Sequence, residues 1–166
     1  MLRLLLLTLA LLLAGCDSRP QFVNTDISEA GYARDFALTD HNGKPRTMAD
    51  FRGKAVVIFF GYTQCPDVCP TTMTGMAEAM KLLGGDAAKV QVLFVTVDPE
   101  RDTQQLLAQY VPVFNPSFLG LFADAQTIAR TAQEFRVFYK KQPGSTPTTY
   151  TVDHSAGSYV YDPQGR

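Results

Sequence analysis

Three stretches of the chain are almost continuously apolar and rich in β-branched or aromatic side chains. They cover residues 56–62, 90–97 and 118–122. Runs of this length and composition are typical of strands that are buried on both faces of a sheet. We expect residues 56–62 to form the central strand of that sheet.

Between these runs, apolar side chains recur at spacings of three and four residues, which predicts helices with one apolar face. One helix is expected over residues 71–83. Two more are expected over residues 103–110, with Asp102 as N-cap, and over residues 125–135, with Asp124 as N-cap.

Shorter signals complete the pattern. Turn-forming residues at 40–44, between short apolar segments at 36–38 and 47–48, predict an N-terminal hairpin. Residues 148–152 and 158–162 have the composition of two further strands. Strands that alternate with helices are joined by right-handed crossovers, which predicts an α/β sandwich with a mostly parallel central sheet and helices on both faces.

The first 15 residues have the features of a secretory signal peptide, because Arg3 is followed by a Leu-rich apolar run. This run is shorter than the roughly 20 apolar residues that a membrane-spanning helix needs. It ends in Leu-Ala-Gly-Cys, which resembles a bacterial lipobox, so Cys16 is expected to carry a lipid after cleavage. An ordinary cleaved signal followed by an incidental cysteine is the alternative.

Asp17 directly follows Cys16 and resembles the signal that retains Gram-negative lipoproteins in the inner membrane. We therefore expect a lipid-anchored protein on the periplasmic face of the inner (cytoplasmic) membrane. Residues 16–34 are polar and irregular, as a tether would be, and residues 35–166 are long enough for one domain.

The net charge excludes one class of partner, and the number of cysteines needs an explanation. A formal net charge of −1 argues against a nucleic-acid partner, because a nucleic-acid-binding protein needs a basic face. Three cysteines are an odd number for an exported protein. If Cys16 carries a lipid, the pair Cys65 and Cys69 remains to be explained.

This pair lies between the expected central strand and the helix that follows it, where reactive groups gather in α/β sheets. Two cysteines four positions apart can place both sulfurs on one side if the loop makes a helical turn. Pro70 suits the first helical position, which would make Cys69 the N-cap. We therefore expect the helix dipole to make Cys69 the more acidic thiol.

A permanent structural disulfide between Cys65 and Cys69 is the alternative interpretation in an oxidising compartment. Such a bond would close a very short loop, and the stabilisation that a disulfide brings falls as the loop shortens. We therefore favour a disulfide between these two cysteines that forms and breaks reversibly.

His154 lies between the last two expected strands, in the sequence Val-Asp-His-Ser. A lone histidine is usually structural, but the end of a neighbouring strand can approach the cysteine loop across the sheet. The other histidine, His41, is interpreted as a solvated residue of the hairpin turn.

Three motifs together resemble the Sco (SenC) family. They are the cysteine loop within residues 59–70, the run Val-Asp-Pro-Glu-Arg-Asp-Thr at 97–103, and residues 152–155 followed by Tyr-Val-Tyr-Asp at 159–162. The resemblance extends from about Phe36 to the last residue. It implies a thioredoxin-like fold and a copper site formed by Cys65, Cys69 and His154.

The resemblance further implies a metallochaperone for the binuclear copper site of cytochrome c oxidase. Its partners would be the copper-site subunit of the oxidase and other periplasmic copper chaperones or thiol reductants. One alternative is a thiol-disulfide oxidoreductase, in which Cys65 and Cys69 reduce the cysteines of the oxidase copper site. Another is an electron-transfer or peroxide-reducing module on the same fold.

The donor set agrees with copper. Two thiolates and one imidazole suit Cu(I), and they can hold Cu(II) when a further ligand joins. Zinc is the competitor, and a zinc enzyme would need an acid/base carboxylate beside the metal, for which Asp67 or Asp153 are the candidates. Asp98, at the end of its strand, either orients a ligand or partner or belongs to the turn before Pro99.

Two other features receive an ordinary interpretation. Met73, Met76 and Met80 have helical spacing and are expected to fill the core, although they could form a thioether strip for copper. Lys140 and Lys141 are expected to be a solvated pair, with partner docking as the alternative.

The chain ends in a turn signal at residues 162–166. Because domains of the Sco family usually continue with a strand and a closing helix, we expect these C-terminal elements to be missing, which would leave an unpaired sheet edge.

Overall fold

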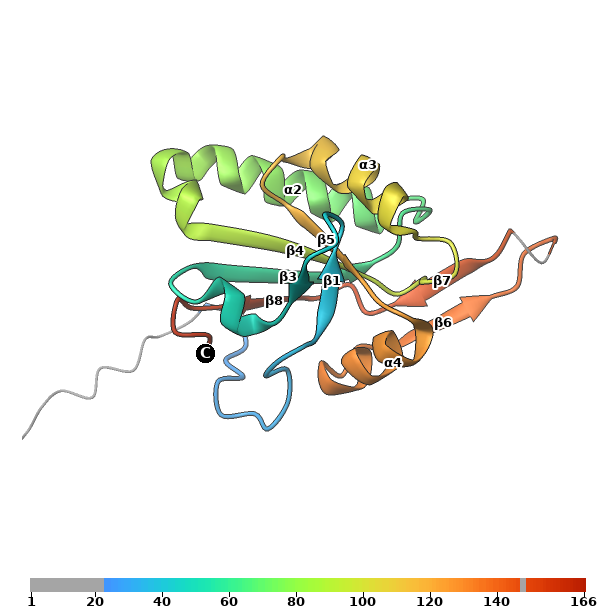
Figure 1. The fold of residues 1–166 in the computed structure, drawn as a ribbon, viewed down its shortest axis with the longest axis horizontal. Helices are drawn as coiled ribbons and strands as arrows, with labels where there is room; N and C mark the ends of the chain where they lie inside the picture. Colours follow the sequence, from blue (N-terminus) through green and yellow to red (C-terminus); the bar gives the residue numbers. More distant parts are fainter. Residues whose placement is uncertain (1–22, 147–148) are drawn as a thin grey trace, which may run out of the picture.

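The computed structural model describes residues 23–146 and 149–166, and their main element is a six-stranded sheet with the order β2-β1-β5-β4-β3-β8 (Figure 1). The strands are β1 (Leu38–Asp40), β2 (Pro45–Arg46), β3 (Ala55–Gly61), β4 (Val90–Thr96), β5 (Leu119–Phe122) and β8 (Ser158–Tyr161). The three long apolar runs form β3, β4 and β5, which are parallel to one another. The shorter outer strands pair antiparallel, so the sheet as a whole is mixed rather than mostly parallel.

Helices cover both faces of this sheet, as the alternating pattern predicts. α2 (Val68–Leu83) and α3 (Gln104–Phe114) lie together on one face, and α4 (Ala125–Glu134) lies on the other (Figure 1). Two 3-10 segments, η1 (Met48–Phe51) and η2 (Gly84–Lys89), precede β3 and β4.

The helix caps agree with the sequence at one of two positions. Asp124 caps α4, and its carboxylate accepts a hydrogen bond from the Thr127 amide at 2.8 Å. α3 is capped by Thr103 rather than by the expected Asp102. The Asp102 side chain is not available as a cap, because it is buried and holds hydrogen bonds from Thr63 and Thr96.

A second, two-stranded sheet stands beside the main one. It consists of β6 (Tyr139–Gln142) and β7 (Thr151–His154), paired antiparallel so that Tyr139 faces His154. The sequence analysis missed β6, where Lys140 and Lys141 lie, and placed β7 about three residues too early. Both lysines are exposed, as expected, and Lys141 also forms an ion pair with the exposed Glu100 at 2.5 Å.

Aromatic and methionine side chains fill the space between the main sheet and its helices. Met73 and Met80 are buried and Met76 packs against the core, which confirms that this row fills the core. His41 is also buried, so its assignment as a solvated residue is wrong. Its Nδ1 accepts a hydrogen bond from the Gly120 amide at 3.0 Å and so ties the N-terminal hairpin to β5.

The expected tether joins the domain before residue 35. Ala33 is only 3% exposed, its amide donates to the Glu134 carbonyl at 2.8 Å, and its carbonyl accepts from the Tyr161 hydroxyl at 2.6 Å. The predicted signal peptide and Cys16 lie outside the described residues. Within those residues, the helices are all too short or too polar to cross a membrane.

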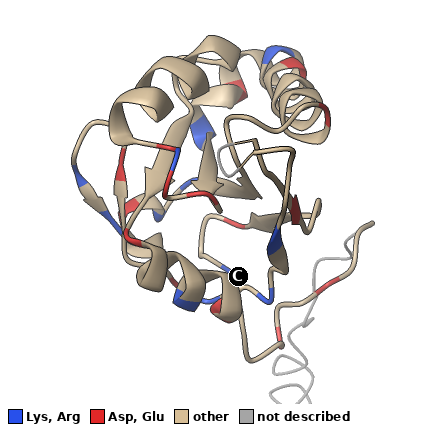
Figure 2. Cartoon of the chain, turned by 90° about the vertical axis from the view of Figure 1, so that its right-hand side faces the viewer, with Lys and Arg blue, Asp and Glu red and all other residues tan. Residues whose placement is uncertain are grey.

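The last strand of the described chain, β8, lies at an edge of the main sheet and is followed by residues 162–166. It pairs with β3 on one side, and Val160 on this strand is 64% exposed. The expectation that a further strand and helix are missing remains a prediction. Viewed from the side of β6 and β7, acidic and basic residues are both spread over the fold (Figure 2).

Candidate metal centre

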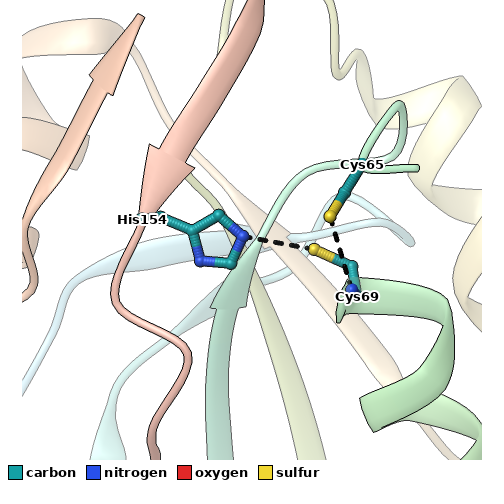
Figure 3. A group of neighbouring side chains, drawn as sticks. All are labelled: Cys65, Cys69 and His154. Carbon is teal, nitrogen blue, oxygen red and sulfur yellow. Dashed lines mark hydrogen bonds between the residues drawn. The ribbon is translucent and has the colours of Figure 1, made fainter. Parts of the chain in front are cut away.

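Cys65, Cys69 and His154 meet at the carboxyl end of β3 (Figure 3). The two Sγ atoms and one ring nitrogen of the histidine all lie within 4.8 Å of one another. Both cysteines are free thiols in this structure. The histidine is 85 residues away from Cys69 in sequence, so only the fold brings the three together.

The cysteine loop leads directly from β3 into α2. Within it, the Cys65 amide donates to the Tyr62 carbonyl at 3.2 Å, and the Cys69 amide donates to Cys65 Sγ at 3.4 Å. These bonds form the turn that places both sulfurs on one side of the loop, as the spacing predicts. The start of the loop is held by Asp102, which accepts from both the amide and the hydroxyl of Thr63.

The helix begins earlier than expected. Asp67 is the N-cap of α2, so Cys69 lies inside the first turn and is not the N-cap. Cys69 is fully buried, and this burial raises the pKa of its thiol, with a further increase from its hydrogen bond to Cys65. The expectation that the helix dipole makes Cys69 the acidic thiol is therefore wrong, because the loss of water outweighs the dipole.

Gly61 makes room for the Cys69 sulfur. A Cβ at this position would lie 2.8 Å from Cys69 Sγ and 2.9 Å from the ring of Phe94. No side chain larger than that of glycine fits between β3 and the first turn of α2 without moving one of these neighbours. This strand lies between β4 and the edge strand β8, so it is not the central strand expected from the sequence. Its last residue, Gly61, sets where the sulfur can be.

His154 ends β7 with one ring nitrogen directed at the cysteines. Nε2 lies 3.4 Å from Cys69 Sγ, and Nδ1 lies 3.0 Å from the carbonyl oxygen of Ser155. A carbonyl oxygen only accepts hydrogen bonds, so Nδ1 carries the proton and Nε2 presents its lone pair to the sulfurs. The rings of Phe59 and Tyr62 pack edge-on against the imidazole, with centroids 6.0 Å and 5.9 Å away, and fix its plane.

A few hydrogen bonds connect β7 to its surroundings. The Val152 amide donates to the Tyr62 hydroxyl at 3.2 Å, which joins the histidine strand to the end of β3. Ser155 and Phe138 exchange two bonds, one from the Ser155 amide at 2.9 Å and one to the Ser155 hydroxyl at 3.0 Å. Burial raises the pKa of Tyr62, so its hydroxyl keeps its proton in ordinary buffers.

The structure separates the three candidate carboxylates. Asp67 is exposed at the N-cap position of α2, where its side chain makes no capping hydrogen bond, and Asp153 is exposed and accepts from Gln142 at 2.5 Å. Neither belongs to the cluster of candidate ligands. Asp98 is fully buried and holds Arg101 and the Tyr150 hydroxyl beside the cluster.

The sequence analysis missed Arg101 and the role of Asp102. Both follow β4, which lies next to β3 in the sheet. Because the carboxyl ends of parallel strands meet at one edge, polar residues just after β4 had to lie near the cysteine loop. That signal was available in the sequence.

Comparisons with known proteins agree with this site. The family model described as SCO1/SenC matches residues 24–166. The SCO2 homologue of Bos taurus mitochondria is 43% identical over 133 residues, which are 79% of this chain and 50% of that protein. The chain thus spans about half the length of the curated relatives it matches.

Two solved structures extend the likeness to three dimensions. ScoI of Bradyrhizobium japonicum with copper bound is 45% identical, with a TM-score of 0.75 over 80% of this chain and 83% of that chain. Yeast Sco1 with copper bound is 34% identical, with a TM-score of 0.72 over 80% of this chain and 74% of that chain. The thioredoxin-like α/β fold is thereby confirmed, and the chain belongs to the SCO1/SenC family.

Proposed function

We propose that this protein is a copper metallochaperone that serves the assembly of the binuclear copper site of cytochrome c oxidase. Copper is its cargo, held by Cys65, Cys69 and His154. The observation that carries the proposal is the convergence of these three donor atoms within 4.8 Å in a chain of the SCO1/SenC family. Two relatives with the same fold were solved with copper bound, which supports it.

The chemistry of the donors suits this cargo. Two sulfurs and one imidazole nitrogen are a soft set that favours Cu(I) over harder cations. The tautomer of His154 already presents Nε2 to the site. Copper has to displace the Cys69 proton, because burial keeps this thiol protonated.

The site can also act as a reductant, and we keep this second function because both thiols are free and adjacent. In that reaction the Cys65 and Cys69 thiols form a disulfide. Two electrons and two protons pass to a disulfide of the acceptor, such as the oxidase copper-site subunit, which becomes a dithiol. His154 distinguishes the two functions, because copper transfer needs it and dithiol exchange does not.

We further propose that the domain is anchored by a lipid on Cys16 at the periplasmic face of the inner membrane. The lipobox-like sequence before Cys16 and the following Asp17 support this proposal. The Cys16→Ser variant is expected to leave the membrane fraction. A variant that stays membrane-bound would contradict the lipid anchor.

Metal analysis of the anaerobically reduced protein tests the copper function. Reduced protein is expected to bind about one copper ion per chain, and protein with a Cys65–Cys69 disulfide essentially none. His154→Ala should lose most of this copper, whereas His41→Gln, at the other histidine, should keep it. Equal uptake in both redox states, or uptake of zinc alone, would overturn the proposal.

The same variants separate the two functions in cells that assemble cytochrome c oxidase. If His154→Ala abolishes both copper binding and oxidase assembly, the metallochaperone function holds. If it abolishes copper binding but assembly continues, the reductase function is the correct one.

A further inference from the structure

Arg101, in the loop between β4 and α3, contacts both segments that carry the candidate ligands. Its Nη1 donates to Gln64 Oε1 at 3.0 Å and to the Tyr150 carbonyl at 2.9 Å. Gln64 directly precedes Cys65, and Tyr150 directly precedes β7, which ends at His154. One nitrogen therefore joins the cysteine loop to the histidine strand.

The guanidinium group is itself held in place from two sides. Its Nε donates to Asp98 at 2.5 Å, and the carboxylate of Asp98 is completely buried. The other oxygen of Asp98 accepts from the Tyr150 hydroxyl at 2.7 Å, and the guanidinium stacks 3.6 Å from the centre of the Tyr150 ring. Asp98, Arg101 and Tyr150 thus form a closed triangle that leaves the Arg101 side chain only 14% exposed.

Asp98 neutralises the positive charge of Arg101. Arg101 therefore acts on the site through the positions of its hydrogen-bond partners and not through its charge. The remaining terminal nitrogen, Nη2, is buried and has no hydrogen-bond partner in the part of the chain that the structure describes. The bridge therefore depends on Nη1 and Nε in one plane. A lysine ammonium lacks this planar fork and cannot make the same set of contacts from one position.

The histidine strand needs such a connection because it is not part of the six-stranded sheet. Without it, the separation between the sulfurs and the imidazole would vary, and binding a metal would have to restrict that motion at a cost in affinity. We propose that Arg101 is a positioning residue that holds the cysteine loop and the histidine strand at the separation copper needs. This inference rests on the proposed copper function and adds to it a residue that is not a ligand.

The first test is the affinity for Cu(I) of anaerobically reduced Arg101→Met and Arg101→Lys, measured by competition with a Cu(I) chelator. Loss of a group that supports metal ligands weakens binding by about 10–100-fold, and we expect this for Arg101→Met, with Arg101→Lys in between. Arg136→Met is the matched control, because Arg136 also stacks on a tyrosine, Tyr32, at 4.1 Å. It should bind copper as the wild type does.

The second test needs no metal. Amide hydrogen exchange in the metal-free protein should accelerate in residues 63–65 and 151–154 of Arg101→Met and remain unchanged elsewhere. Gln64→Ala removes only the hydrogen bond from Arg101 to the cysteine loop, so it should have a smaller effect on copper affinity than Arg101→Met. It should add nothing in the Arg101→Met background, because both changes remove the same contact.

The outcomes separate this inference from the proposed function. If wild-type protein binds no copper, the proposed function fails, and hydrogen exchange alone decides on Arg101. If copper binds but Arg101→Lys and Gln64→Ala keep wild-type affinity and wild-type exchange, the positioning role is wrong. These two milder variants carry the test if Arg101→Met does not fold.

Discussion

The cysteine side and the histidine side of the site are supported by different parts of the fold. The cysteine loop continues from β3, a strand that is paired on both sides within the six-stranded sheet, and Cys69 packs in the core. His154 ends a strand of the separate two-stranded sheet, with both Thr151 and Asp153 of that strand exposed. Cys69 is therefore part of the buried core, whereas the imidazole is on a strand held by its pairing with β6 and by a few further hydrogen bonds.

This difference predicts two kinds of variant. A change around Cys69 on the cysteine side should lower both the stability of the domain and its metal binding, because Cys69 is part of the buried core. A change on the histidine side should lower metal binding with a smaller effect on stability, because Val152 is the one buried side chain among the four described residues of β7.

The largest effect is expected from Gly61→Ala on the cysteine side. The added Cβ would lie 2.8 Å from Cys69 Sγ and 2.9 Å from the Phe94 ring, so one of them has to move. Overpacking of this kind lowers the free energy of unfolding by about 3 kcal/mol and should displace the sulfur, which weakens copper binding. Urea denaturation and Cu(I) competition measure both effects.

Gly75→Ala is the matched control for that variant. Gly75 lies within α2, and a Cβ there would meet no atom within 4 Å. Alanine in a helix should raise the free energy of unfolding by about 0.5–1 kcal/mol and leave copper binding unchanged. A Gly61→Ala protein as stable as the wild type would show that the sulfur is not confined at this point.

A smaller effect is expected from Tyr62→Phe on the histidine side. This change removes the hydroxyl that accepts from the Val152 amide and leaves that buried amide without its partner. The expected loss in free energy of unfolding is about 1 kcal/mol, at the low end for such a group. Copper affinity should fall, while the midpoint potential of the Cys65–Cys69 couple should not change.

Tyr161→Phe controls for the loss of a tyrosine hydrogen bond as such. The Tyr161 hydroxyl donates to the Ala33 carbonyl, away from β7. Its removal should cost a similar amount of stability without any loss of copper affinity. If both variants lose copper equally, the hydrogen bond to Val152 is not what holds the histidine side.

The same division explains what could be predicted from the sequence. Strands β3, β4 and β5 and helices α2 and α4 were predicted because long apolar runs and helical periodicity are local signals. β6 was missed because it lies outside the main sheet. This strand is held by its backbone pairing with β7. It contains Lys140 and Lys141 instead of an apolar run, so its sequence does not have the pattern of a buried strand.

The site follows the same rule. The approach of two cysteines four residues apart is a local property, and the convergence with His154 was expected from the motifs rather than from their spacing. The burial of His41 and of Cys69 could not be predicted, because it depends on neighbours far away in sequence, such as Gly120 and Phe94. The expectation of an acidic Cys69 thiol was wrong for this reason.

The smallest effect on the fold is expected when Cys65 is replaced by serine, which leaves Cys69 as the one thiol of the pair. In Cys65→Ser, the free energy of unfolding should stay within about 1 kcal/mol of the wild type, because this side chain is half-exposed. Only the thiolate is alkylated, and burial holds the pKa of Cys69 above the ordinary thiol value of 9.0. Alkylation of Cys69 should therefore be slow near neutral pH and still accelerate above pH 9.

Cys69→Ser reports the reactivity of Cys65 and is the matched control. Because the folded state holds the Cys69 proton more tightly than the unfolded chain does, the contribution of this thiol to stability is complete below pH 9 and declines above it. A Cys69 alkylation rate that levels off below pH 8 would mean that the helix dipole outweighs burial after all. In that case the cysteine side would offer copper a ready thiolate, and the contrast between a buried, protonated sulfur and a histidine on a partly exposed strand would no longer hold.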